Sequence, residues 1–134
     1  MTTFNDDFEF GEPGFTRPSS KEDKEQGIDA WIGNIPVAWR KRRISIMKYK
    51  QISIRYERAS RRKTEKDKIL DGTFIPKVYF FQFTDALVIC YTSEIKKCLQ
   101  NRNLYKIMDN CDGTWGCYIR SADVANRIVI LAND

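Results

Sequence analysis

The stretch GIDAWIGNIPVAWRKRR, residues 27–43, predicts a tight β-hairpin around which the fold is built. Two runs of β-type residues, 28–32 and 35–43, are separated only by Gly33 and Asn34. This dipeptide accepts positive φ angles and closes a two-residue loop. We therefore expect two antiparallel strands whose register is set by the turn.

Asp29 and Arg40 are expected to project from the same face of this hairpin. Counting outward from the turn places Asp29 opposite Ala38, and directly opposed residues share a face. Arg40 is then a diagonal neighbour of Asp29, roughly 7–8 Å away, which a guanidinium side chain spans. Arg40 also begins a run of four cations that ends at Arg43. The hairpin is a plausible place to hold a metal ion and a phosphate; a simple Asp29–Arg40 ion pair is the alternative.

Length and composition indicate one globular domain. The chain has 134 residues, of which 42% are hydrophobic and 13% aromatic, and this is too apolar for a disordered protein. The acidic N-terminus does not resemble a signal peptide, and no run approaches 18 apolar residues. We expect a soluble, cytoplasmic protein with no membrane partner.

The chemistry of this chain is restricted by its lack of histidine. Without histidine there is no imidazole acid–base catalysis and no His-ligated metal. The four cysteines lack CxxC spacing, so we expect reduced thiols in the core rather than a zinc site. Any catalysis has to use carboxylates, cations and a metal ion.

Charge is distributed unevenly along the chain. Residues 1–30 carry three cationic and eight acidic side chains, a net charge of −5, whereas residues 31–77 carry fourteen cationic and four acidic ones, a net charge of +10. Residues 78–134 carry six of each. A net charge concentrated in this way predicts a surface that binds a polyanion, with a merely solvated basic face as the alternative.

Hydrophobic periodicity predicts an α/β or α+β protein with a mixed central sheet covered by helices. Residues 1–20 are expected to form an acidic and aromatic N-terminal arm, and residues 21–134 a single domain. The expected elements are a short helix before Gly27, the hairpin, strands 51–58, 77–83 and 86–91, a helix 92–101, a hairpin of 103–108 with 115–119, and a last strand or helix end at 128–131.

A second helix is expected between the basic loop and the aromatic strand. Thr64 and Asp67 have the spacing of a capping-box pair, and the helix is expected to end near Asp71 and Gly72. Glu65 would then lie at the positive end of the helix, one turn before a buried residue. Its carboxylate is expected to lean toward the protein interior.

Phosphodiester hydrolysis without histidine is usually metal-dependent, because Mg²⁺ needs only one or two carboxylates, waters and the substrate phosphate. In this respect the segments EDKEQGIDAWIGNIPVAWRKR (22–42), ISIRYE (52–57) and KTEKDKIL (63–70) resemble the PD-(D/E)xK nuclease superfamily. That superfamily includes restriction enzymes, Holliday-junction resolvases and some homing endonucleases, and small phage and bacterial members show this order of motifs. The resemblance implies a restriction-endonuclease-like core, Mg²⁺ or Mn²⁺ as cofactor, DNA as partner and a homodimer.

The second motif of the superfamily is degenerate in this chain. If Asp29 matches the family's aspartate, the acidic position falls on Ala38 and the lysine position on Arg40. Alanine binds no metal, and arginine stays charged and cannot act as a base. Lys41 or Lys63 are the candidates to replace the missing lysine.

The missing metal ligand is expected on another element. Glu65 is the first candidate and Glu57, on the preceding strand, the second. Glu22 and Asp23 are candidates for the family's helix acid, with solvated acids of a first helical turn as the alternative. The expected metal ligands are therefore Asp29 with Glu65, or with Glu57 or Glu22. Arg40 would stabilise the charge that develops on the phosphate.

Two functions follow from this resemblance: a metal-dependent DNA endonuclease of the homing or junction-resolving type, or a catalytically inactive nuclease-like DNA-binding protein. An interaction protein, whose acidic arm covers the basic face, is a third class. The residues expected to hold the nucleic-acid backbone are Arg40, Lys41, Arg42, Arg43, Arg55, Arg58, Arg61, Arg62 and Lys63.

Overall fold

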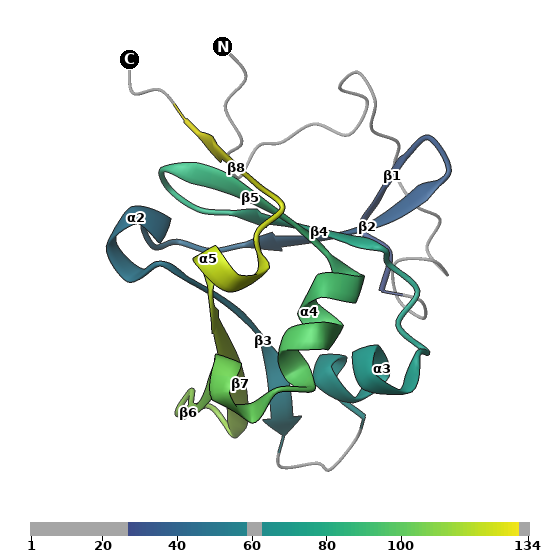
Figure 1. Ribbon diagram of the computed structural model, residues 1–134, viewed down its shortest axis with the longest axis vertical. Helices are drawn as coiled ribbons and strands as arrows, with labels where there is room; N and C mark the ends of the chain where they lie inside the picture. Colours follow the sequence, from purple (N-terminus) through teal and green to yellow (C-terminus); the bar gives the residue numbers. More distant parts are fainter. Residues whose placement is uncertain (1–26, 59–62, 132–134) are drawn as a thin grey trace.

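The computed structural model describes residues 27–58 and 63–131, which form two β-sheets and several short helices (Figure 1). Sheet A has five strands in the order β1 (Ala30–Ile32), β2 (Ile35–Lys41), β4 (Val78–Gln82), β5 (Ala86–Tyr91) and β8 (Arg127–Ile130). Sheet B has three antiparallel strands in the order β3 (Gln51–Arg58), β7 (Thr114–Arg120) and β6 (Tyr105–Asp109). The helices are α2 (Ile46–Tyr49), α3 (Glu65–Asp71), α4 (Thr92–Leu99) and α5 (Ser121–Val124), with a 3₁₀ turn at Arg102–Leu104.

The predicted hairpin is confirmed, including its register. Strands β1 and β2 pair antiparallel with Ala30 opposite Val37 and Ile32 opposite Ile35. Gly33 closes the turn with a φ of 61°, a conformation that glycine adopts without strain. Strand β2 then runs parallel to β4, and the connection between them passes through α2, β3 and α3.

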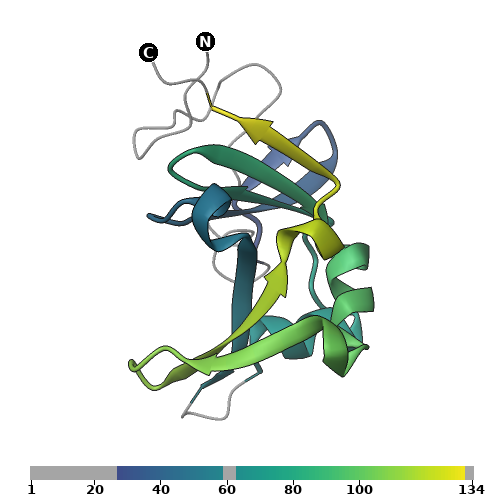
Figure 2. The ribbon, with the colours of Figure 1, turned by 60° about the vertical axis from the view of Figure 1, so that its left-hand side comes forward.

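The predicted fold class, a mixture of helices and strands, is confirmed. The prediction of a single central sheet is wrong, because the strands form two separate sheets. Strand β3 does not join the sheet that holds the hairpin, but pairs with β7, far along the chain, to begin sheet B. Sheet B, α3 and α4 lie on the same side of sheet A, and the β6–β7 hairpin extends away from it (Figures 1 and 2).

The main core lies between the two sheets and the two longer helices. Tyr79 and Phe81 of sheet A are fully buried there, beside Ile52 of sheet B, Ile69 of α3 and Ile95 of α4. The rings of Tyr79 and Phe81 stack with their centroids 5.1 Å apart. The opposite face of sheet A carries a second, smaller apolar cluster that includes Val37, Val78, Phe80 and Leu87.

Helix α3 forms as its sequence predicts. The Asp67 carboxylate accepts the Thr64 backbone N–H at 3.0 Å, and Gly72 ends the helix with a φ of 82°. Lys66, paired with Asp67 at 2.6 Å, and the Thr64 backbone together lower the pKa of the Asp67 carboxyl. This capping box places Glu65 in the first turn, where the helix dipole favours an acid.

Three of the four cysteines lie in the core as expected, Cys90, Cys98 and Cys117. Burial raises the pKa of the Cys90 and Cys117 thiols to about 12. Cys111 differs, because it lies exposed in the β6–β7 turn with a φ of 62°. Buried neutral thiols of this kind are packing residues rather than nucleophiles.

Several predictions fall outside the described residues. These are the N-terminal arm, the helix before Gly27, Glu22, Arg61 and Arg62. Within the part of the chain that the structure describes, no helix has the length and apolar character needed to cross a membrane.

Candidate functional site

Arg40 joins the two predicted metal ligands. Its Nη1 atom lies 2.6 Å from Asp29 Oδ2, and its Nη2 atom lies 2.9 Å from Glu65 Oε2. The Trp39 backbone N–H also donates to Asp29 Oδ2, at 2.8 Å. The hairpin register therefore brings Asp29 to Arg40, and α3 brings Glu65 to the other side of the same guanidinium.

The Glu65 carboxylate is held by two further groups. The hydroxyl of Tyr79 donates to Oε2, and the Arg55 backbone N–H donates weakly to Oε1 at 3.4 Å. Tyr79 is fully buried on β4, so its hydroxyl links the site to the core. The Glu65 side chain is only 13% exposed, against 26% for Asp29, so Glu65 is the more desolvated partner of Arg40.

These contacts determine the protonation states of Arg40 and Tyr79. Burial opposes the charge of Arg40, but Glu65, Tyr79 and Asp29 together raise the pKa of its guanidinium above the ordinary value. Burial, reinforced by the charge of Glu65, raises the pKa of the Tyr79 hydroxyl well above its ordinary value. Arg40 therefore stays cationic and Tyr79 stays a neutral donor throughout the pH range in which proteins are folded.

Beside this group lies a pocket of about 430 Å³, here called the arginine pocket. One wall comes from β2 with the residue that follows it, which supply Arg40 and Arg42, and from α3, which supplies Glu65 and Lys68. The rest comes from Gly27, Phe74 and sheet B with the turn that follows β6, which supply Ser53, Ile54, Arg55, Asn110, Gly116 and Tyr118. Four cationic side chains therefore surround a single carboxylate, Glu65, which already binds Arg40.

Arg42 is the cation with the least favourable surroundings. Its Nη2 atom donates to the Ser53 carbonyl at 3.0 Å, and its guanidinium lies 5.8 Å from the centre of the Phe81 ring. Burial lowers the pKa of Arg42, and the nearby charge of Glu65 only partly offsets this while Arg40 adds to it. Among the described residues, no carboxylate forms an ion pair with Arg42, Arg55 or Lys68.

The donor set does not make a metal centre in this arrangement. Within residues 27–58 and 63–131, no group of three or more Asp, Glu or Cys side chains could hold a metal ion. The guanidinium of Arg40 occupies the position between Asp29 and Glu65 that a shared cation would need. The two predicted ligands thus meet, and the Arg40 guanidinium lies between them and pairs with both.

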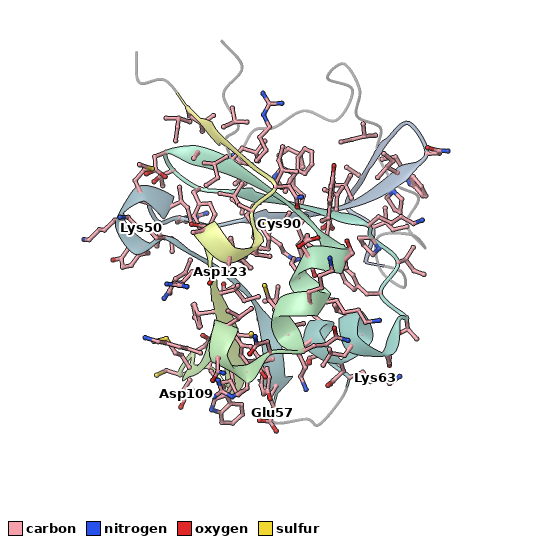
Figure 3. The ribbon with its side chains drawn as sticks, in the orientation of Figure 1. Lys50, Glu57, Lys63, Cys90, Asp109 and Asp123 are labelled. Carbon is pink, nitrogen blue, oxygen red and sulfur yellow. The ribbon has the colours of Figure 1, made fainter. Side chains whose placement is uncertain are left out.

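Glu57 and Lys63 are not brought to the site. Figure 3 shows both at the lower edge of the molecule, pointing outward. A β-bulge after Arg55 pairs Glu57 with Trp115 and Arg55 with Gly116, so the Glu57 side chain faces away from the side of sheet B that carries Arg55. Lys63 instead pairs with Asp71, their Nζ and Oδ2 atoms 2.6 Å apart.

The other predicted cations divide between the pocket and the surface. Arg40, Arg42 and Arg55 line the arginine pocket, whereas Lys41 and Arg43 are exposed. Arg58 is the last residue of β3. Alternation along extended backbone explains why the pocket includes Arg40 of β2 and Arg42, the residue after β2, but not Lys41 between them.

Three groups of the site were missed from the sequence: Lys68 and Tyr118, which line the pocket, and Tyr79, which holds the Glu65 carboxylate. Lys68 could have been found, because it lies one helical turn after Glu65 and shares its face. Tyr79 and Tyr118 are indistinguishable in sequence from ordinary strand aromatics, and only the pairing of distant strands brings them here.

Comparisons with protein-family models, with curated proteins and with solved structures found no match for this chain.

Proposed function

We propose that this protein binds the sugar–phosphate backbone of a nucleic acid and holds one phosphate in the arginine pocket. The observation that carries the proposal is Arg42, a half-buried cation that the described residues leave without a carboxylate. A desolvated cation is costly unless a counter-charge reaches it. A phosphate oxygen supplies that charge and accepts the parallel N–H donors of a guanidinium.

The surroundings of the pocket favour a polyanion over a single small anion. Arg55 and Lys68 add two exposed cations at its rim, and Lys41 and Arg43 continue the positive surface along β2 and beyond its end. Residues 31–77 carry a net charge of +10, and all of these residues belong to that segment. Backbone binding by such a surface is strong at low salt and carries little sequence information.

The proposal is tested by measuring the fluorescence anisotropy of a labelled 20-base-pair DNA with wild type, Arg42→Gln and Lys97→Gln. Lys97 is an exposed residue of α4 outside the pocket, so its substitution removes the same charge elsewhere. We expect Arg42→Gln to weaken binding about tenfold, the typical effect of one charge-assisted hydrogen bond, and Lys97→Gln to weaken it less than about twofold. Equal effects of the two substitutions would contradict the proposal.

A second candidate function is a metal-dependent DNA endonuclease that works as a homodimer, cutting homing sites or junctions. It is favoured by the meeting of Asp29 and Glu65, two acids 36 positions apart in sequence, on one guanidinium beside the cationic pocket. The order of elements also supports the resemblance to the PD-(D/E)xK superfamily and its restriction-endonuclease-like core: Asp29 precedes β1 of a hairpin, and β2 is parallel to the strand reached through α3. This function requires that Mg²⁺ or Mn²⁺ take the place of Arg40 between the two acids.

Nicking of supercoiled plasmid with Mg²⁺ or Mn²⁺ separates the two candidates. An endonuclease predicts nicking that Asp29→Asn and Glu65→Gln both abolish while DNA binding remains. A nuclease-like binding protein predicts a gel shift and no nicking with either ion. Analytical ultracentrifugation of the same samples tests whether the active species is a dimer.

A further inference from the structure

The arginine pocket continues onto one face of sheet B. Directly opposed residues share a face, and Ser53 lies opposite Tyr118, which in turn lies opposite Lys106. The surface made by this face is here called the sheet B track, and its principal side chains are Ser53, Arg55, Tyr118, Lys106, Met108 and Arg120. Ser53, Arg55 and Tyr118 also line the pocket, so the two surfaces are continuous.

Charge is sorted between the two faces of sheet B. Among the described side chains of its three strands, the cations Arg55, Lys106 and Arg120 are on the track. The acids Glu57 and Asp109 pair with Trp115, the residue before Gly116, and therefore face the other way. Two acids from neighbouring segments lie near track cations. Asp123 of α5 binds Arg120 at 2.9 Å. Asp112 of the β6–β7 turn has its pKa lowered mainly by hydrogen bonds from Thr114 and in part by the charge of Arg55.

Tyr118 occupies the middle of the track in a fixed position. A Cβ atom at Gly116 would lie 2.8 Å from Tyr118 Cε2, so the ring lies across Gly116 and needs the absence of a side chain there. The Tyr118 hydroxyl donates to Asn110 Oδ1 at 2.9 Å and holds the far end of the ring. A half-exposed ring between cations is the arrangement on which the bases of a single strand stack.

We propose that the sheet B track binds an unpaired stretch of the nucleic acid whose phosphate occupies the arginine pocket, with one base stacked on Tyr118. Three strands spaced about 4.8 Å apart make the track about 10 Å wide, which is room for one or two nucleotide steps. A base inside a duplex is already stacked on its neighbours and cannot cover Tyr118. The inference deepens the proposed function and rests on it.

The test compares a labelled 12-nucleotide single strand with a 20-base-pair duplex at one salt concentration. The track variants are Tyr118→Leu and the pair Lys106→Gln with Arg120→Gln. The pair Lys48→Gln with Arg127→Gln is the control, because it removes the same charge from exposed residues outside the track. Tyr118→Phe is a second control, because it keeps the aromatic ring and removes only the hydroxyl. Circular dichroism of every variant checks that the fold is retained.

We expect Tyr118→Leu to weaken single-strand binding about 5- to 100-fold, the range for loss of one stacked base, and Tyr118→Phe to stay within about twofold. The paired Gln substitutions should weaken single-strand binding at least about tenfold more than the control pair does. Duplex binding should change less than about threefold in all of these variants. Equal losses of affinity for single strand and duplex, or no loss of affinity beyond that of the control pair, would contradict the proposal that the sheet B track binds a single strand.

Failure of the track is distinguishable from failure of the pocket. If Arg42→Gln weakens binding of both ligands and the track variants weaken neither, phosphate binding in the arginine pocket is supported and single-strand binding on the sheet B track is contradicted. If Arg42→Gln also has no effect, both proposals are wrong.

Discussion

Arg40 of β2 and Arg42, the residue that follows this strand, have opposite energetic roles. Arg40 binds Asp29 and Glu65, and these partners raise its pKa, so the folded state favours its charge. Arg42, two residues further along, has its pKa lowered by burial, so the folded state disfavours its charge. The surroundings of Arg40 thus favour its charge and those of Arg42 do not, which is the pattern expected if Arg42 belongs to the proposed binding site.

Substitution of these two arginines by methionine should therefore have different effects on stability. We expect Arg40→Met to lower the free energy of unfolding by about 2–3 kcal/mol, because it leaves a largely buried Glu65 carboxylate unpaired. Arg42→Met should change it by less than about 1 kcal/mol, in either direction. Urea denaturation at pH 7 measures both.

A third variant distinguishes the contribution of the Arg40–Glu65 ion pair to the free energy of unfolding from the contribution of Arg40 packing. Glu65→Gln removes the charge that Arg40→Met leaves unpaired, so the two substitutions together should cost less than the sum of each alone. Two outcomes would contradict these roles of Arg40 and Arg42: strictly additive changes in the free energy of unfolding for Arg40→Met and Glu65→Gln, or a larger loss of stability for Arg42→Met than for Arg40→Met.

Much of this residue-scale picture could be predicted from the sequence. The two-residue turn at Gly33 and Asn34 sets a register, and that register alone places Asp29 beside Arg40. The position of Glu65 followed from its capping box. The Tyr79–Glu65 hydrogen bond could not be predicted, because it depends on how α3 packs against sheet A.

At the scale of elements, short helices depend on side chains far away in sequence. Helix α2 has only four residues, and its start is held by Asp85 from the β4–β5 turn. The Asp85 carboxylate accepts the Ser45 hydroxyl and the backbone N–H groups of Ile46 and Met47. Burial opposes the charged form, but these hydrogen bonds outweigh it and lower the pKa of Asp85.

This cap predicts a pH-dependent contribution to stability. Asp85→Ala should cost about 1–2 kcal/mol at pH 7, the usual effect of losing a helix cap. Because the folded pKa lies below the unfolded value of about 3.9, the contribution is fully present above pH 5 and is lost as the pH falls through the folded pKa. Urea denaturation of wild type and variant between pH 7 and pH 2 should show the difference shrinking; a constant difference would contradict the cap.

The elements that were predicted correctly are those with strong local signals. The hairpin, β5 and α3 each have a turn, an apolar run or a capping pair of their own. Helices α2 and α5 were missed because four residues give no periodicity. The second sheet was missed because pairing between β3 and β7 is a contact across more than 50 residues, which no local pattern encodes.

At the scale of the whole molecule, two sheets enclose a cationic pocket between them. Strand β2 of sheet A supplies Arg40, the residue after β2 is Arg42, α3 supplies Glu65 and Lys68, and sheet B supplies Arg55. None of these elements forms the pocket by itself, although all of its cations come from the segment that the sequence marks as basic. The charge pattern predicts a surface that binds a polyanion, and the tertiary structure gathers four cations of that segment around one pocket.

The most direct test of the account is the salt dependence of DNA binding by a triple pocket variant, Arg42→Gln with Arg55→Gln and Lys68→Gln. The control, Lys48→Gln with Lys97→Gln and Arg127→Gln, removes the same charge from exposed residues outside the pocket. If the pocket cations contact phosphates, the slope of log K against log salt should become shallower by about 2–3 in the pocket variant, and by less than about 0.5 in the control. Identical slopes and affinities for the two triple variants would contradict phosphate binding in the arginine pocket.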